Sequence, residues 1–320
     1  MKQLALLLTL LLLFSCDGGK PGEKNLRFAF VPKMRDNPVF TYAKVAAEHR
    51  AKELGGIEIL WRAPNEPDAV EQGQIVERLV GLGVDGIAIS CNEAEPLRRP
   101  INAAVEAGIP VICFDADSPE SKRQYLFGTD DVAAGRVLGK EIGRLIGGEG
   151  EVAILTGFSG ADNLNRRVQG VEEALSEEHP NVKIVQKLFC DDDAKKAIDS
   201  IESYMQTKPD LNGWVVVGGW PLWAKDGLAS IDPNKTKFVC FDALPEQWSY
   251  LERRECQVLI GQDLWGWGAT SVDILKSIID KKDYPGADEK GYVPAPVAIL
   301  TPETLSAYRE QWKTWFGETR

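Results

Sequence analysis

Two stretches of this chain are nearly identical. Val111–Ala116 reads VICFDA and Phe238–Ala243 reads FVCFDA, so the second stretch lies 127 residues after the first. The same offset pairs Asp85–Ile89 (DGIAI) with Asn212–Val216 (NGWVV). Each repeat contains an apolar strand that ends at an aspartate, and parallel α/β sheets bind ligands outside the carboxyl ends of their strands. We therefore expect two similar lobes that each offer a carboxylate to a ligand between them.

Apolar, strand-like runs alternate with helix-like stretches along the chain. These runs are mostly continuous rather than alternating, which is typical of strands covered on both faces. They are Leu26–Val31, Ile57–Trp61, Gly86–Ser90, Val111–Asp115, Tyr125–Gly128, Glu151–Leu155, Val182–Gln186, Trp214–Val217, Lys237–Asp242 and Val258–Gly261. Asn37 as a cap, Pro38 in the first turn and Gly55 as a stop mark the first helix. The alternation predicts an α/β fold of two doubly wound parallel-sheet lobes joined by a hinge.

The order of these segments suggests how the chain is divided between the lobes. We expect residues 25–129 and about 262–290 to form the first lobe, and residues 130–261 and about 291–320 to form the second. Tyr292–Pro302 contains three prolines and is typical of an extended connector that leads to a final helix. Further helices should begin at Asp130 or Asp131, at Asp162 or Asn163, and at Asp193.

The amino terminus is typical of an exported lipoprotein. Met1-Lys2 is basic, and Leu4–Leu13 is an apolar run broken by Thr9, which is too short to span a bilayer but suits a secretory signal. Leu13-Phe14-Ser15-Cys16 resembles a lipobox, which predicts a signal peptide over residues 1–15 and a lipid on Cys16. The alternative is an ordinary signal peptide with an incidental cysteine. Residues 16–24 are expected to form a tether, and Asp17 favours a periplasmic protein retained at the inner membrane.

Composition excludes several function classes. A formal net charge of −11 argues against nucleic acid, which needs a basic face. The two histidines, His49 and His179, have no second ligand at metal spacing, and neither a Gly-x-Ser-x-Gly motif nor a Walker loop is present. We expect no metal, no cofactor and no hydrolase triad. The five cysteines that follow Cys16 show no C-x-x-C spacing, so we expect them to be buried free thiols.

One glycine motif is a false signal. Gly81–Gly86 matches G-x-G-x-x-G, but a dinucleotide-binding loop follows a strand and opens a helix. Here the motif follows a helix and precedes a strand. It therefore predicts a helix stop and a turn.

Three residues directly after strands suit a sugar. The carboxylates of Asp115 and Asp242 can each accept hydrogen bonds from two hydroxyls, and the Trp220 indole can stack on the C–H face of a sugar ring. The same aspartates could instead be the acid and base of a glycosidase, or could only cap turns. Trp220 could likewise only pack the second lobe.

Together these features resemble the periplasmic sugar-binding proteins of the ribose-binding type. The resemblance covers about residues 26–290. It is carried by Asn37-Pro38-Val39-Phe40, by Gly128-Thr129-Asp130-Asp131 with Gly135, and by Arg167 three residues before Gly170. It implies a ligand between the lobes, with Asn37, Phe40, Asp115, Arg167, Asp242 and Gln262 at the family's sugar positions.

Several positions depart from the ribose pattern. Val39 and Asp192 stand where aromatic rings are expected, and Ala116, followed by Asp117, stands where an arginine follows the aspartate. Gly218 and Gly219 replace an asparagine, and Trp220 adjoins them. We include Asp117, Asp192 and Trp220 among the candidate ligand residues and expect a sugar pocket of a different shape.

The resemblance implies a monomeric, non-enzymatic solute-binding lipoprotein. It would capture a monosaccharide, bind an ABC permease in the inner membrane, and be held at the membrane through Cys16. One alternative is a binding protein that reports to a chemoreceptor or sensor kinase. Others are a glycoside hydrolase that uses Asp115 and Asp242, and a transcription regulator, which shares the fold but needs a DNA-binding segment where the signal peptide stands.

Overall fold

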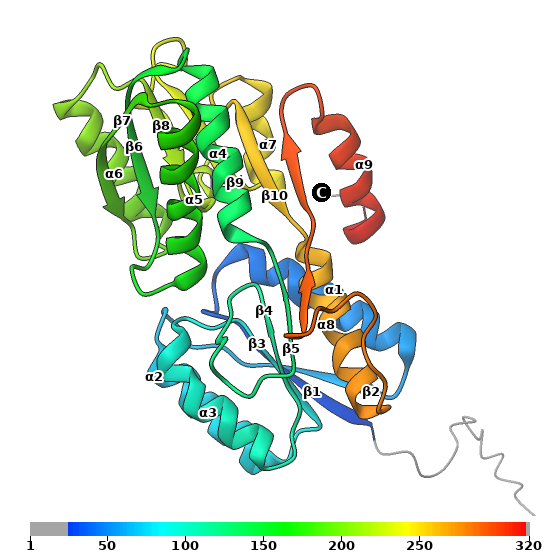
Figure 1. Cartoon of the computed structure of the whole chain (residues 1–320). Coiled ribbons are helices and arrows are strands. Elements are labelled where there is room, and N and C mark those ends of the chain that lie inside the picture. Colours follow the sequence, from blue (N-terminus) through cyan, green and yellow to red (C-terminus); the bar gives the residue numbers. More distant parts are fainter. Residues whose placement is uncertain (1–24, 318–320) are drawn as a thin grey trace, which may run out of the picture.

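The computed structural model describes residues 25–317 and contains two α/β lobes (Figure 1). The predicted signal peptide, Cys16 and the predicted tether lie outside the described residues. The sheet of the first lobe has the order β11-β5-β4-β3-β1-β2, with all neighbouring strands parallel. Its strands are β1 (Leu26–Val31), β2 (Ile57–Trp61), β3 (Gly86–Ile89), β4 (Val111–Phe114), β5 (Tyr125–Gly128) and β11 (Tyr292–Pro294). Its helices are α1 (Pro38–Leu54), α2 (Ala69–Leu82), α3 (Ala94–Glu106) and α8 (Leu264–Ile279).

The second lobe repeats this plan. Its sheet has the order β12-β10-β9-β8-β6-β7. The strands are β6 (Glu149–Thr156), β7 (Asn181–Phe189), β8 (Gly213–Val216), β9 (Lys237–Asp242), β10 (Val258–Gln262) and β12 (Val297–Leu300). The helices are α4 (Asp131–Leu145), α5 (Asp162–Glu178), α6 (Ala194–Thr207), α7 (Pro245–Glu252) and α9 (Leu305–Phe316), with a short 3₁₀ helix η1 (Trp220–Trp223).

The internal repeat is a repeat of structure. β4 and β9, which carry the matching hexapeptides, occupy the same place in the two sheet orders, and so do β3 and β8. The predicted α/β fold with two parallel-sheet lobes is therefore confirmed. The edge strand β12 is an exception, because it runs antiparallel to β10.

Three segments of chain connect the lobes (Figure 1). The chain crosses after β5 into α4, returns between β10 and α8, and crosses again between β11 and β12. The sequence predicts that the chain enters the second lobe for the last time at about residue 291. The crossing lies later, after Pro294, because Tyr292–Pro294 pairs with Leu126, Phe127 and Gly128 in the first sheet. Several parallel connections of this kind allow two rigid lobes to rotate about a hinge.

Local signals set the limits of the helices. The Asn37 side chain accepts a hydrogen bond from the Val39 N–H at the start of α1, and Asp130 and Asp193 cap α4 and α6 in the same way. Gly83 ends α2 in the left-handed conformation, with φ at 62°, so the glycine motif is a helix stop as predicted. The helix α5 begins at Asp162, as predicted, although its N-cap is Ala161, which has no capping side chain.

Two helices of the second lobe approach each other closely. A Cβ at Gly135 on α4 would lie 2.0 Å from the Arg167 carbonyl oxygen, and a Cβ at Gly170 on α5 would lie 2.1 Å from the Val132 carbonyl oxygen. Real Cβ atoms do not approach backbone oxygens so closely. Glycine at both positions therefore lets α4 and α5 touch, and this contact fixes the position of Arg167.

The cysteines are free and buried, as predicted. The structure describes five, Cys91, Cys113, Cys190, Cys240 and Cys256. Among residues 25–317, no helix combines the length and the apolar composition needed to cross a membrane.

Candidate functional site

The residues at the carboxyl ends of the two sheets meet in a cavity between the lobes. We call this space the inner cavity. It is lined by Lys33, Asn37, Val39, Phe40, Asp115, Asn163, Leu164, Arg167, Asp192, Gly218, Trp220, Trp223, Asp242, Gln262 and Trp267. The structure thus brings together eight of the nine candidate ligand residues, from both lobes.

Asp117 is the candidate that lies elsewhere. Its carboxylate accepts two hydrogen bonds from the Arg123 guanidinium, at 2.7 and 2.8 Å. It lines a neighbouring cavity instead of the inner one. We therefore leave Asp117 out of the inner-cavity set.

The pocket aspartates sit where a strand or loop turns sharply. Asp115 follows β4, Asp242 ends β9 and Asp192 follows β7, and all three have positive φ, at 59°, 84° and 59°. Aspartate tolerates this left-handed conformation better than most residues. The turn leaves each side chain beside the cavity.

Arg167 is the most heavily bonded side chain of the site. Its Nε donates to Asp131 Oδ1 at 2.8 Å, Nη1 to the Val217 carbonyl at 3.1 Å, and Nη2 to Gln262 Oε1 at 2.8 Å. Its guanidinium lies 4.0 Å above the Phe241 ring. Because this fork is held rigidly, Arg167 orders the groups around it as well as facing the cavity.

Gln262 extends this network to Asp242. The Gln262 amide donates to Asp242 Oδ1 at 2.7 Å, and the Gly219 N–H donates to Asp242 Oδ2 at 2.8 Å. Gln262 ends β10, where the chain crosses back to the first lobe. Gln262 therefore connects the pocket residue Asp242 to the crossing segment between β10 and α8.

Lys33 and Asn163 join the two lobes, and neither was among the predicted ligand residues. Lys33 follows β1, and its Nζ donates to Asn163 Oδ1 at 2.7 Å and lies 3.9 Å from Asp115 Oδ2. Asn163 in turn donates to Asp115 Oδ1 at 3.2 Å. The position of Lys33 directly after a predicted strand is the signal that could have identified it. Asn163 gave no such signal, because its sequence context indicates only a helix start.

The departure from the ribose pattern at Gly218 has a steric explanation. A Cβ at Gly218 would lie 2.4 Å from the Trp220 ring, and a Cβ at Gly157 would lie 2.6 Å from the same ring. The glycines therefore make room for an indole that is only 3% exposed. The indole N–H groups of Trp223 and Trp267 also border the cavity and have no hydrogen-bond partner among residues 25–317.

Burial disfavours the charged form of the carboxyl groups in the site. Lys33, Asp115, Asp131, Arg167, Asp192 and Asp242 are all buried, so four carboxylates face two cations. Burial, more than any neighbouring charge, raises the pKa of Asp131 to about 6 and that of Asp242 to about 6, and it also raises the pKa of Asp192. Among residues 25–317, no group of three or more His, Cys, Asp or Glu side chains could hold a metal ion.

We expect the Asp242 carboxyl to make stability depend on pH. Since its pKa is higher in the folded chain, at about 6, than its ordinary value of 3.8, the folded state binds this proton more tightly. Stability that this group contributes below about pH 4 is therefore lost as pH rises towards 6. Asp242→Asn should gain stability relative to the wild type between pH 4 and pH 6, and the difference should be constant above pH 7. Urea unfolding across this range measures it.

A control of opposite sign is available in the same chain. Backbone N–H groups of Tyr292 and Lys290 lower the pKa of the exposed Asp288 below its ordinary value of 3.8. Asp288→Asn should therefore lose stability relative to the wild type as pH rises towards 3.8, and the difference should be constant above pH 4, where that of Asp242→Asn is still changing. Parallel stability curves for Asp242→Asn and the wild type would contradict the raised pKa of Asp242.

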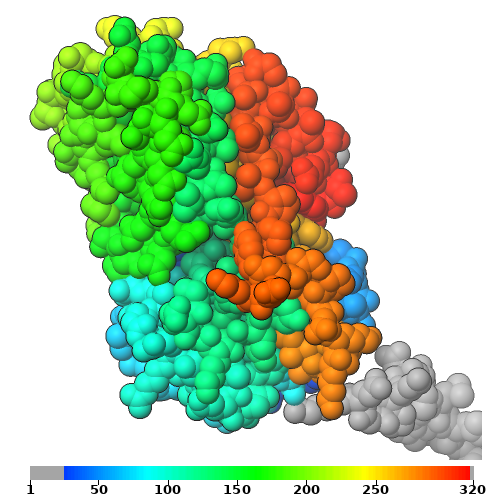
Figure 2. Space-filling view, viewed as in Figure 1, coloured from blue at the N-terminus to red at the C-terminus, as the bar shows by residue number. Residues whose placement is uncertain are grey.

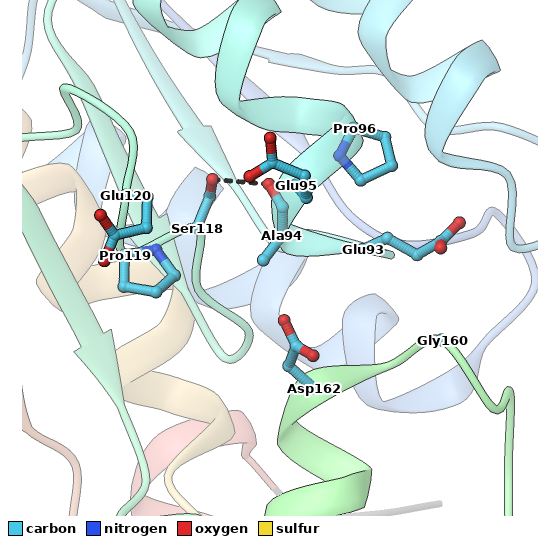
Figure 3. Close-up of a pocket in the computed structure, with 9 residues that line it drawn as sticks. All are labelled: Glu93, Ala94, Glu95, Pro96, Ser118, Pro119, Glu120, Gly160 and Asp162. Carbon is cyan, nitrogen blue, oxygen red and sulfur yellow. Dashed lines mark hydrogen bonds between the residues drawn. The ribbon is translucent and has the colours of Figure 1, made fainter.

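The rim of the cleft is acidic. A pocket of about 190 Å³ lies between the start of α3, the loop after β4 and the start of α5, and four carboxylates line it: Glu93, Glu95, Glu120 and Asp162 (Figure 3). The Ser118 hydroxyl donates to the Ala94 carbonyl at 2.8 Å and ties two of these segments together. A rim of one sign repels ions of that sign. It therefore favours a neutral solute over an anion.

The chain is similar in sequence to a known protein family and to sugar-binding relatives. Residues 28–283 match the family described as periplasmic binding protein domain. The chain is 27% identical over 262 residues to the D-allose-binding periplasmic protein of Escherichia coli, covering 78% of this chain and 83% of that protein. It is 26% identical over 215 residues to the ribose import binding protein of Bacillus subtilis, covering 64% and 69%.

A solved structure shows the same architecture. An ABC transporter solute-binding protein from Burkholderia graminis, in complex with D-arabinose, superposes with a TM-score of 0.83 at 28% identity. The superposition covers 90% of this chain and 99% of that one.

Proposed function

The chain belongs to the periplasmic binding protein family, and we propose that it captures a monosaccharide in the inner cavity and delivers it to an ABC importer. The observation that carries this proposal is the convergence of both lobes on one polar, tryptophan-lined cavity. Carboxylates and amides can take the hydroxyls of a sugar, while indole rings cover its C–H faces. The similar proteins are named for binding ribose or allose, and one was solved with arabinose.

Capture requires the lobes to move. The inner cavity measures about 40 Å³, which is room for about one water molecule, whose share of the liquid is about 30 Å³. A sugar ring can enter only after the lobes rotate apart, and the inter-lobe bonds of Lys33, Asn163 and Asp115 must then open. Hydroxyl groups of the sugar would replace these bonds when the lobes close again.

We also propose that the site does not hydrolyse its sugar. The carboxylate of Asp242 is fixed by donors from Gln262 and Gly219, and that of Asp115 by donors from Ser90 and Asn163. These bonds present both groups as acceptors for hydroxyls, which suits recognition better than proton transfer to a glycosidic oxygen. One relative is named a ribose import binding protein and the similar solved structure is named an ABC transporter solute-binding protein, which favours transport over sensing.

The family and the amino terminus together support a proposal about the location. We propose an exported monomer whose first 15 residues are removed and whose Cys16 carries a lipid that holds it at the inner membrane. Metabolic labelling with a fatty-acid analogue tests the lipid, and Cys16→Ser is the matched control. Label that persists in Cys16→Ser would contradict this proposal.

A titration followed by tryptophan fluorescence tests the function. Trp220, Trp223 and Trp267 border the cavity, so binding should change their emission. We expect a saturable response to at least one of ribose, allose, arabinose, xylose, galactose or glucose, with no product formed. At a hundred times the dissociation constant the same sugar should add about 2.7 kcal/mol of stability. Trp220→Ala should weaken binding at least tenfold, whereas Trp315→Ala on α9 should not.

A further inference from the structure

A second and larger cavity lies beside the inner one. We call it the outer cavity; it measures about 610 Å³. Ligand pockets in proteins usually measure about 300–1,000 Å³. The outer cavity already has this size in the structure, whereas the inner cavity must widen by lobe rotation before it admits a sugar ring. Asp115 and Asn163 line both cavities and are joined by a hydrogen bond of 3.2 Å. The two spaces are thus neighbours across one pair of side chains.

The outer cavity is built from both lobes and from two of the crossing segments. Leu126 and Thr129 come from β5 and the crossing after it, Arg166 and Gln169 from α5, and Tyr292 from β11. A hollow is visible in Figure 2 between the green second lobe and the blue-green first lobe, next to the orange segment. Because its walls belong to both lobes, hinge rotation would open and close it together with the inner cavity.

The lining repeats the chemistry of a sugar site. The Thr129 hydroxyl is buried, lines the cavity and has no hydrogen-bond partner among residues 25–317. A buried polar atom without a partner is costly unless a ligand or water satisfies it. Asn165 and Gln169 supply amides, and Tyr292 supplies an aromatic ring that is partly exposed.

The charge of the outer cavity limits what it can hold. Its lining contains more carboxylates than cations: Asp115, Asp117, Asp130, Asp131, Asp162 and Asp288 against Arg123, Arg166 and Lys290. Arg123 is already paired with Asp117. A phosphate or uronate group would be repelled, whereas a neutral polyhydroxylated group would not.

We propose that the outer cavity is a second subsite, which holds a neutral glycosidic substituent of a sugar whose first ring occupies the inner cavity. The ligand would then be a disaccharide or another neutral glycoside, whose link passes between Asp115 and Asn163 and replaces their mutual hydrogen bond. This proposal rests on the proposed sugar-binding function and extends it from one ring to two groups.

Calorimetric titration of matched pairs tests the subsite. The probes are D-xylose with methyl β-D-xyloside and xylobiose, D-arabinose with its methyl glycosides and arabinobiose, and D-allose with methyl β-D-alloside. We expect at least one derivative to bind ten times more tightly than its parent sugar. Gln169→Trp, which fills the outer cavity from an exposed position, should remove this advantage and leave the affinity for the parent within twofold. Ser176→Trp, exposed on the same helix outside the cavity, should change neither.

Every other outcome of this titration contradicts the second subsite, the sugar-binding function or both. If parent sugars bind and no derivative binds more tightly, the second subsite is wrong and the sugar-binding function stands. If Gln169→Trp weakens parent and derivative equally, the outer cavity is no separate subsite. If no probe of either kind binds, the sugar-binding function fails, and the subsite fails with it.

Discussion

Arg167→Met should lower the free energy of unfolding by about 3–5 kcal/mol, the usual cost of breaking a buried ion pair. The variant leaves the buried Asp131 carboxylate without its cation and leaves the Val217 carbonyl and Gln262 amide oxygens without their donor. Urea unfolding at pH 7, followed by far-ultraviolet circular dichroism, measures the loss. Ligand binding should be lost as well, because the orientation of Gln262 depends on this guanidinium.

The neighbouring residue provides the control for this variant. Arg166 is exposed on the same helix, so Arg166→Met should change stability by less than about 0.5 kcal/mol. The double variant Arg167→Met/Asp131→Leu should recover part of the lost stability, since it removes the unpaired charge as well. Equal effects of Arg166→Met and Arg167→Met would show that the buried network contributes little.

Gly135→Ala should destabilise the second lobe by about 1–3 kcal/mol or more, the range for overpacking of a close contact. The new Cβ would lie 2.0 Å from the Arg167 carbonyl oxygen and 2.8 Å from the carbonyl carbon. These are backbone atoms that cannot move aside without moving α5. Because α5 carries both Arg167 and Asn163, sugar affinity should fall together with stability, as thermal unfolding and fluorescence titration would show.

A glycine with free space gives the matched comparison. Gly81 lies in α2, and a Cβ there would have no neighbour within 4 Å. Gly81→Ala should raise stability by about 0.5–1 kcal/mol, since alanine favours a helix over glycine. If Gly135→Ala were as harmless as Gly81→Ala, the close packing of α4 and α5 would not determine the site.

The fold could be predicted from sequence because its signals are local and repeated. The matching hexapeptides mark β4 and β9, and continuous apolar runs mark the other central strands. Glycine and asparagine at helix ends gave the correct limits at Gly83 and Asn37. The antiparallel β12 was not predicted, because the direction of an edge strand depends on how the chain returns and not on its own residues.

A site residue could be predicted only where a side chain with a functional group directly follows an apolar strand. Asp115 and Asp242 follow apolar strands and carry a functional group, so they could be identified from the sequence. Asn163 could not be, because its contact with Asp115 joins different lobes and depends on how far the hinge closes. Asp117 follows a strand equally well, but Arg123, six residues later, pairs with it and holds it outside the inner cavity.

Calorimetric titration of the best-binding monosaccharide, which occupies the inner cavity alone, tests the site most directly when it is done on three proteins: the wild type, Asp115→Leu and Asp117→Leu. Both substitutions remove a carboxylate from the same loop after β4, but only Asp115 lines the inner cavity. We predict one site per chain in the wild type, at least a hundredfold weaker binding in Asp115→Leu, and affinity within about threefold of the wild type in Asp117→Leu. Equal affinity of the wild type and Asp115→Leu would contradict the claim that the sugar is held between the two lobes.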